Sequence, residues 1–115
     1  MKIEIQNDTL ILGNRKHVFG NTIGQVIALD NIVFVLLLKR KRDQIDMGEQ
    51  TGNNVYALNP EGDILWNIFE ILKEYDCITY MKIDGDNQMI LYSAGGANIR
   101  IDIMKKCIID VHAFK

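Results

Sequence analysis

The alternation of polar and apolar residues constrains the fold of this chain more than any other feature. In the first strand-like stretch, residues 2–6, Ile3 and Ile5 alternate with polar neighbours. A period of two indicates a β-strand with one buried face. Comparable stretches follow at 24–30, 31–39, 54–59, 63–68, 77–84, 87–93, 98–104 and 107–114. We therefore expect an all-β, mainly antiparallel fold whose β-meanders form a sandwich or a strongly curved sheet.

Segment 64–75 fits two patterns. Leu65, Ile68, Phe69 and Leu72 follow helical spacing, although the first residues of the segment also suit a strand. We assign strand to about Ile68 and at most one short helix near 69–75.

The segment 32–38, IVFVLLL, is apolar at both parities. A strand with two apolar faces is buried on both sides. This predicts a position between two layers of the fold or beneath a dimer partner.

A weak internal repeat divides the chain. LDNIVFVLLL followed by NNVYALNPEGDILW resembles GDNQMILYSA followed by ANIRIDIMKKCIID. Asn59 and Asp102 hold the same place in the two copies, where an Asx side chain can start a turn by accepting backbone hydrogen bonds. We expect a single domain, 1–115, with an N-terminal meander over 1–20 and two blade-like repeats over 24–68 and 77–114.

The phrase VYALNPEGDILW resembles the repeat of pyrroloquinoline-quinone-type β-propellers, which reads VYALDPxTGxxLW. The match covers about fourteen residues and is loose in the second copy. Because propellers need roughly four to eight blades, the resemblance implies local meanders, and it implies neither a closed propeller nor a quinone cofactor.

Composition limits where the protein is expected to reside and which kinds of partner it is expected to bind. The formal net charge of -2 creates no strong field toward nucleic acid or membranes. The N-terminus lacks a signal-peptide h-region, and the longest apolar run is far too short for a membrane helix. We expect a cytoplasmic protein in which Cys77 and Cys107 are reduced, packed thiols, while an intramolecular disulfide stays possible on cysteine count.

No set of residues matches a catalytic or metal-binding pattern. His17 and His112 are the histidines of the chain, and the nearest nucleophile, Cys107, is five residues before His112. An odd separation on one strand places side chains on opposite faces, which argues against a Cys–His pair. The scattered cysteines and histidines also lack zinc spacing. We expect no enzymatic activity, no cofactor and no metal.

Acidic residues gather at predicted turns and in the polar loop 40–53. The basic run KRKR, 39–42, is followed closely by acids, so nucleic-acid binding is not expected. The candidate partner-binding residues are Asp43, Asp46, Glu49, Glu61, Asp63, Glu74, Asp84 and Asp86.

In general character the chain looks like the small immunity proteins of bacterial toxin–immunity pairs. This resemblance implies a protein that blocks the basic active site of a cognate toxin, such as a nuclease, with its carboxylates in place of substrate phosphates. The alternative is a homo-oligomeric structural module, in which sheet edges pair between chains as in a homodimer. A third class, a binder of small ligands, would need an apolar pocket.

Overall fold

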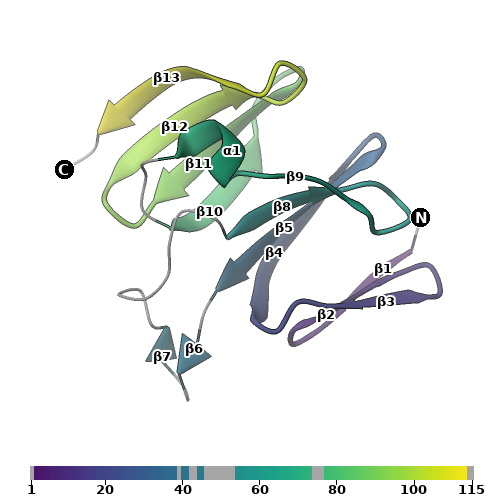
Figure 1. Ribbon diagram of the computed structural model, residues 1–115. Helices are drawn as coiled ribbons and strands as arrows, with labels where there is room; N and C mark the ends of the chain where they lie inside the picture. The colour runs from purple at the N-terminus through teal and green to yellow at the C-terminus, as the bar shows by residue number, and fades with distance from the viewer. Residues whose placement is uncertain (1, 39, 42–43, 46–53, 74–76, 114–115) are drawn as a thin grey trace.

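The computed structural model describes residues 2–38, 40–41, 44–45, 54–73 and 77–113 (Figure 1). Three antiparallel sheets and one short helix make up most of this part of the chain. The predicted all-β class is therefore confirmed. A separate two-stranded hairpin is formed by β6 (Arg40–Lys41) and β7 (Gln44–Ile45).

The N-terminal sheet is a meander of β1 (Ile3–Gln6), β2 (Thr9–Leu12) and β3 (Arg15–Val18). Its first turn lies at Asn7–Asp8, and Asn7 adopts a positive φ of 58°. The second turn lies at Gly13–Asn14. Gly13 takes the left-handed position there (φ 63°), which glycine adopts at lower cost than asparagine.

The central sheet has the order β4–β5–β8–β9 and comprises β4 (Thr22–Leu29), β5 (Ile32–Leu38), β8 (Val55–Leu58) and β9 (Ile64–Asn67). Val55, Ala57 and Trp66 are buried, whereas Ile64 is 59% exposed. A register shift between Ala57 and Leu58 pairs Leu58 with Ile64. This β-bulge changes the parity of β9 and turns Ile64 outward.

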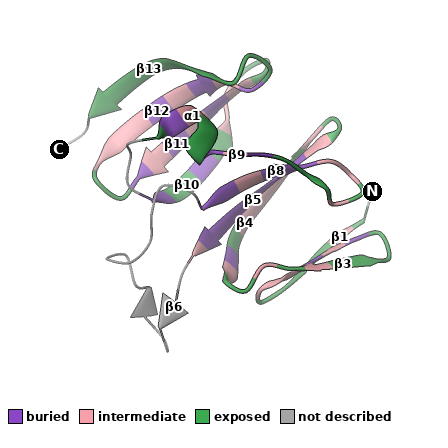
Figure 2. Ribbon diagram, in the orientation of Figure 1, coloured by how far each residue is buried: buried purple, intermediate pink, exposed green. Residues whose placement is uncertain are grey.

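The C-terminal sheet has the order β10–β11–β12–β13 and comprises β10 (Ile78–Ile83), β11 (Gln88–Ser93), β12 (Ala97–Asp102) and β13 (Cys107–Ala113). Along β11 and β12, buried residues alternate with half-buried ones. Every residue of β13 is exposed (Figure 2). Cys77 is buried whereas Cys107 is exposed, and neither forms a disulfide, so the expected packing of Cys107 is wrong.

The sheets stack as three layers with the central sheet in the middle (Figure 1). Phe34 and Leu36 of β5 join the core shared with the C-terminal sheet. Val33 and Val35, at the other parity, join a second core with Leu10 and its neighbours in the N-terminal sheet. The apolar segment IVFVLLL, which forms β5, thus lies between two layers and buries one face against each.

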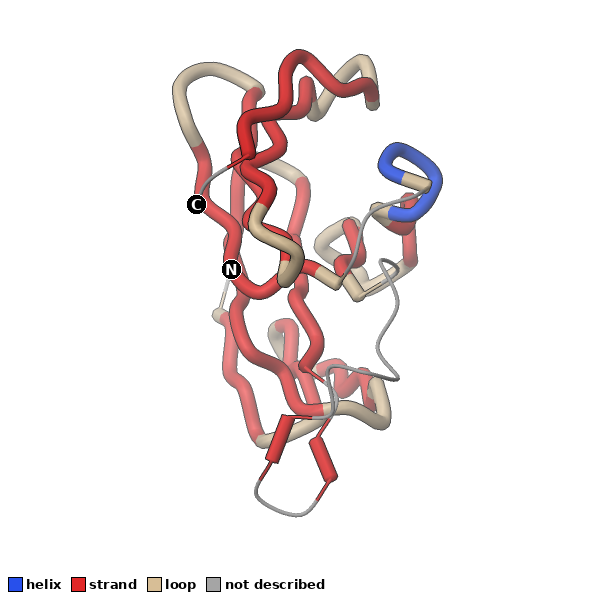
Figure 3. The backbone as a smooth tube through the Cα atoms, turned by 90° about the vertical axis from the view of Figure 1, so that its left-hand side faces the viewer, coloured by secondary structure: helices blue, strands red, loops and turns tan. Residues whose placement is uncertain are grey.

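The helix α1 (Phe69–Leu72) follows β9 and lies at the margin of the stack, where it contacts β9 and β13 (Figure 3). The Asn67 side-chain oxygen accepts a hydrogen bond from the Phe69 N–H at 2.8 Å, and Glu70 accepts one from the Asn67 N–H at 2.9 Å. This reciprocal arrangement resembles a capping box and starts the helix. With four residues, α1 is far too short to cross a bilayer, and no other helix among the described residues could do so.

Candidate functional site

The predicted acidic residues are spread over several elements. Asp43, Asp46, Glu49 and Glu74 lie outside the described residues. Glu61 and Asp63 lie in the turn between β8 and β9, and Asp84 and Asp86 lie in the turn between β10 and β11.

The β8–β9 turn is organised by Asn59. Its side-chain oxygen accepts hydrogen bonds from the N–H groups of Glu61 at 3.0 Å and Asp63 at 2.9 Å. Its side-chain nitrogen donates to the Asp63 carboxylate at 3.1 Å. Glu61 and Asp63 are both exposed at this tip.

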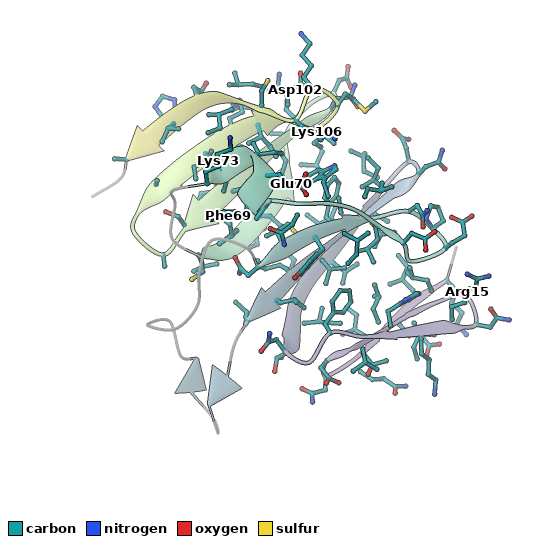
Figure 4. The ribbon with its side chains drawn as sticks, in the orientation of Figure 1. Arg15, Phe69, Glu70, Lys73, Asp102 and Lys106 are labelled. Carbon is teal, nitrogen blue, oxygen red and sulfur yellow. The ribbon has the colours of Figure 1, made fainter. Side chains whose placement is uncertain are left out.

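The equivalent turn of the second repeat is organised by Asp102, whose carboxylate accepts the Lys105 N–H at 2.8 Å (Figure 4). The predicted turn-forming role of Asn59 and Asp102 is confirmed by these hydrogen bonds. Because Asp102 and Lys106 stand together at the turn, this tip carries both signs of charge (Figure 4).

Asp84 and Asp86 have different surroundings. Asp86 is exposed, whereas the Asp84 carboxylate forms an ion pair with Arg100 on β12. Arg100 also donates to the Gln88 side-chain oxygen at 3.0 Å, and its Nε lies 3.9 Å from the Asp110 carboxylate. Asp84 therefore helps to hold Arg100 in place.

The hydrogen bond from Arg100 to Asp84 raises the pKa of Arg100 above its ordinary value. Partial desolvation opposes this shift, and attraction to the carboxylates of Asp84 and Asp110 adds to it. Arg100 consequently carries its charge at any physiological pH.

Arg100 is central to what we call the outer face, the side of the C-terminal sheet turned away from the central sheet. A shallow hollow of about 150 Å³ on this face is lined by Ile90, Tyr92, Asn98, Arg100, Asp110 and His112. Beside it on β10, the ring of Tyr80 lies 5.6 Å from that of Tyr92, and the Lys82 amine lies 5.9 Å from the Tyr92 ring. Tyr80 is 51% exposed. The outer face thus combines aromatic rings with fixed charges.

Asn98 adds an unsatisfied acceptor to the hollow. Its side-chain oxygen is buried and receives no hydrogen bond from the residues that the structure describes. A buried acceptor without a donor is destabilising by about 1–3 kcal/mol. Asn98 thus lines the hollow at the cost of an acceptor that no described donor satisfies.

The outer face has a counterpart in the central sheet. Strand pairing sets Phe34 against Ala57 in β5–β8, and Ile90 against Arg100 in β11–β12. Ala57 and Arg100 occupy equivalent positions of the sequence repeat, since each stands two residues before its turn residue, Asn59 or Asp102. Their partners Phe34 and Ile90 are equivalent as well. One strand further, Ala57 pairs with Trp66, as Arg100 pairs with Asp110.

The two faces differ in what covers them. Phe34, Ala57 and Trp66 are buried against the C-terminal sheet, with the rings of Phe34 and Trp66 5.8 Å apart. In the C-terminal sheet the corresponding side of the strands carries Ile90, Arg100 and Asp110, and no described segment lies over it. The outer face therefore corresponds to the face of the central sheet that packs against a neighbouring layer, but no described segment covers it.

Sequence reasoning did not single out Arg100, Asn98 or Tyr92. The sequence feature that could have indicated them is the alternation within 88–93 and 97–102. It places these three side chains on one face of the sheet, with Met89 and Ile101 on the other face. Recognising a site there requires the register between β11, β12 and β13, which turn length alone does not fix because a bulge separates Arg100 and Ile101 in the β12–β13 pairing.

A second hollow, of about 400 Å³, lies at the turn end of the sheets. It is lined by Leu29, Asp30, Asn31, Ile32, Leu65, Asn87, Ile103 and Met104. It is the kind of partly apolar pocket that a small-ligand binder would need. Among the described residues, no three His, Cys, Asp or Glu side chains gather closely enough to hold a metal ion.

Comparison with known proteins gives a family and no function. No curated protein and no solved structure matches the chain at a significant level. A family model described as a domain of unknown function, DUF7957, matches residues 1–110 and so includes all three stacked sheets apart from the last residues of β13. The chain belongs to the DUF7957 family.

Proposed function

We propose that this protein is a non-enzymatic protein-binding module, and specifically an immunity-type inhibitor that neutralises a cognate bacterial toxin in the cytoplasm. The observation that carries the proposal is the outer face. It corresponds by repeat and by strand register to the face that packs the central sheet onto the C-terminal sheet, yet nothing described covers it. A partner would occupy the place of a further layer.

The chemistry of the outer face supports a protein partner. Tyrosine and arginine are enriched at the energetic centres of interfaces, because each combines a large contact area with directional polar groups. Tyr80 and Tyr92 supply the rings, and Arg100 is already oriented by Asp84 and Gln88. Little side-chain entropy is then lost when a partner binds to Arg100.

Acidic residues at the margin would steer a basic partner. Asp86 is exposed at the β10–β11 turn, next to the end of the outer face, while Glu61 and Asp63 are exposed on the β8–β9 tip. In a toxin that cleaves nucleic acid, such carboxylates would pair with the Lys and Arg side chains that otherwise hold phosphates. Asp43, Asp46, Glu49 and Glu74 remain sequence-based candidates for the same role.

The proposal is tested with the product of the gene that flanks this one. The two proteins are purified, and their dissociation constant is measured by calorimetry for the natural chain and for variants. We expect Tyr80→Ala to weaken binding tenfold or more, and Asp86→Lys or Glu61→Lys to slow association in a salt-dependent way.

Glu4→Lys on the N-terminal sheet is the matched control, since Glu4 is an exposed strand residue of another layer. It should leave the dissociation constant unchanged. The inhibitor proposal is wrong if the flanking gene encodes no toxin, or if the variants of the outer face and of the tips bind as tightly as the control.

A further inference from the structure

The two edge strands of the C-terminal sheet, β10 and β13, differ in whether other residues cover their free backbone edge. At the β10 edge, the Asn54 side-chain oxygen accepts the Ile78 N–H at 2.9 Å, and its nitrogen donates to the Ile78 carbonyl at 2.7 Å. Gln25 does the same for Met81, at 3.0 Å to the N–H and 2.6 Å to the carbonyl. Two side-chain amides thus take the place of a neighbouring strand.

The β13 edge has no such cover. β13 pairs with β12 on one side, and no described segment pairs with the other side. All seven of its residues are exposed, including the apolar Ile109 (44%) and Val111 (40%). Edge strands of soluble proteins usually carry lysine, proline or a covering element that prevents pairing with another chain. β13 contains neither lysine nor proline.

The order of side chains on β13 makes it self-complementary in one register. When two copies pair antiparallel about a two-fold axis at Val111, Asp110 of each lies opposite His112 of the other. Shifting the axis to Asp110 would set two Asp110 carboxylates opposite each other, and shifting it to His112 would set two imidazoles together. Directly opposite like charges are destabilising, and opposite or hydrogen-bonding pairs stabilise a sheet.

The other side of the same strand fits this register. Val111 would meet Val111 of the second copy, and Ile109 would meet Ala113. β-branched residues paired across strands stabilise a sheet by roughly 0.2–1 kcal/mol per pair.

We propose that β13 pairs antiparallel with β13 of a second copy of this chain, with the two-fold axis at Val111 and with Asp110 opposite His112. The two C-terminal sheets then form one continuous eight-stranded sheet with two outer faces on the same side. An imidazole N–H can donate to the carboxylate whether or not the ring is protonated. This pairing does not depend on the proposed inhibitor function.

Cysteine cross-linking tests directly which residues of the two β13 strands lie opposite each other. Val111→Cys is made in a Cys107→Ser background, because the native Cys107 is exposed and would react. Directly opposite residues of an antiparallel pair have Cα atoms roughly 4.5–5.5 Å apart, which suits a disulfide. We expect a covalent dimer to form in a mild thiol–disulfide buffer at micromolar protein.

Ile109→Cys in the same background is the matched control. In the proposed register its two copies are offset by four residues along the strands, roughly 13 Å, so it should stay monomeric on non-reducing gels. Equal cross-linking of both variants, cross-linking by Ile109→Cys alone, or no covalent dimer from either would overturn the proposal.

Charge exchange tests the Asp110–His112 pairing without a new bond. His112→Asp places carboxylates opposite each other, so the dissociation constant of the dimer should rise tenfold or more in sedimentation equilibrium. The exchanged variant Asp110→His with His112→Asp should restore dimerisation, because complementarity returns. A dimer that His112→Asp leaves unchanged, or a protein that sediments as a monomer at all concentrations, would show that β13 does not pair in this way.

Discussion

The central and C-terminal sheets share strand order, turn chemistry and pairing register, but they differ in how many faces are covered. The central sheet lies between two layers, and its strand β5 is apolar at both parities. The C-terminal sheet is covered on one side, and its other side carries Tyr80, Lys82, Arg100 and Asp110. The same scaffold therefore serves stability where it is covered and can serve recognition where it is not.

The largest expected effect comes from the equivalent pair Phe34 and Ile90. Phe34→Ala removes a fully buried ring between two sheets and should destabilise the protein by about 3–5 kcal/mol. Ile90→Ala, at a half-buried position on the uncovered outer face, should cost about 1 kcal/mol because little apolar area is lost. Equilibrium urea unfolding measures both, and similar losses would mean that the outer face is packed as tightly as the core.

A second effect concerns the β10 edge. Asn54 is 4% exposed and also donates to the Leu37 carbonyl at 2.9 Å. Asn54→Ala would leave the N–H and carbonyl of Ile78 without these partners, which we expect to destabilise by about 3 kcal/mol. Hydrogen exchange should show faster exchange of the Ile78 amide. Glu4→Ala, at an exposed position of β1, is the control substitution and should leave the free energy of unfolding within about 0.5 kcal/mol of its natural value.

Part of this structure could be predicted from the sequence. Period-two alternation and the apolar run at 32–38 were enough for the all-β class and for the two-layer burial of β5, because both depend on local patterns. Asn59 and Asp102 could be recognised for the same reason, since an Asx turn is closed by residues two to four positions away.

The remaining features depend on residues far apart in the chain. Asn54 reaches Ile78 across 24 positions and Gln25 reaches Met81 across 56, and nothing in the composition of either neighbourhood indicates the contact. The Asp84–Arg100 pair requires the register of β11 and β12. The exposure of Ile64 could not be predicted either, because a β-bulge leaves no trace in the alternation of polar and apolar residues.

A smaller effect comes from the contact between the N-terminal and central sheets. Gly62 has φ +93°, and a Cβ there would overlap the imidazole ring of His17. Gly62→Ala should therefore destabilise by about 2 kcal/mol. Gly13→Ala has a similar left-handed backbone but open space around it, and should cost about 1 kcal/mol.

The overlap with His17 can be separated from backbone strain by a double-mutant cycle. In a His17→Ala background, Gly62→Ala should cost no more than Gly13→Ala, because only the strained φ remains. If the cost of Gly62→Ala is the same in both backgrounds, the ring of His17 does not pack against this turn.

The smallest effect should come from the paired turns of the two repeats. Asn59→Ala and Asp102→Ala each remove a side-chain acceptor of backbone N–H groups, and each should destabilise by about 1 kcal/mol. Asn59 accepts two such hydrogen bonds and Asp102 accepts one, so thermal unfolding should rank Asn59→Ala as the lower in Tm. The reverse order would show that the number of backbone N–H groups accepted by the side chain does not determine the stability of these turns.

The central claim is that the outer face binds a partner in the place of a further layer. Hydrogen exchange with and without the product of the flanking gene tests it most directly, since an occupied face slows exchange in the strands that form it. We predict slower exchange in β11 and β12, around Tyr92 and Arg100, with β1 and β2 unchanged. Protection confined to the N-terminal sheet, with β11 and β12 unaffected, would contradict it.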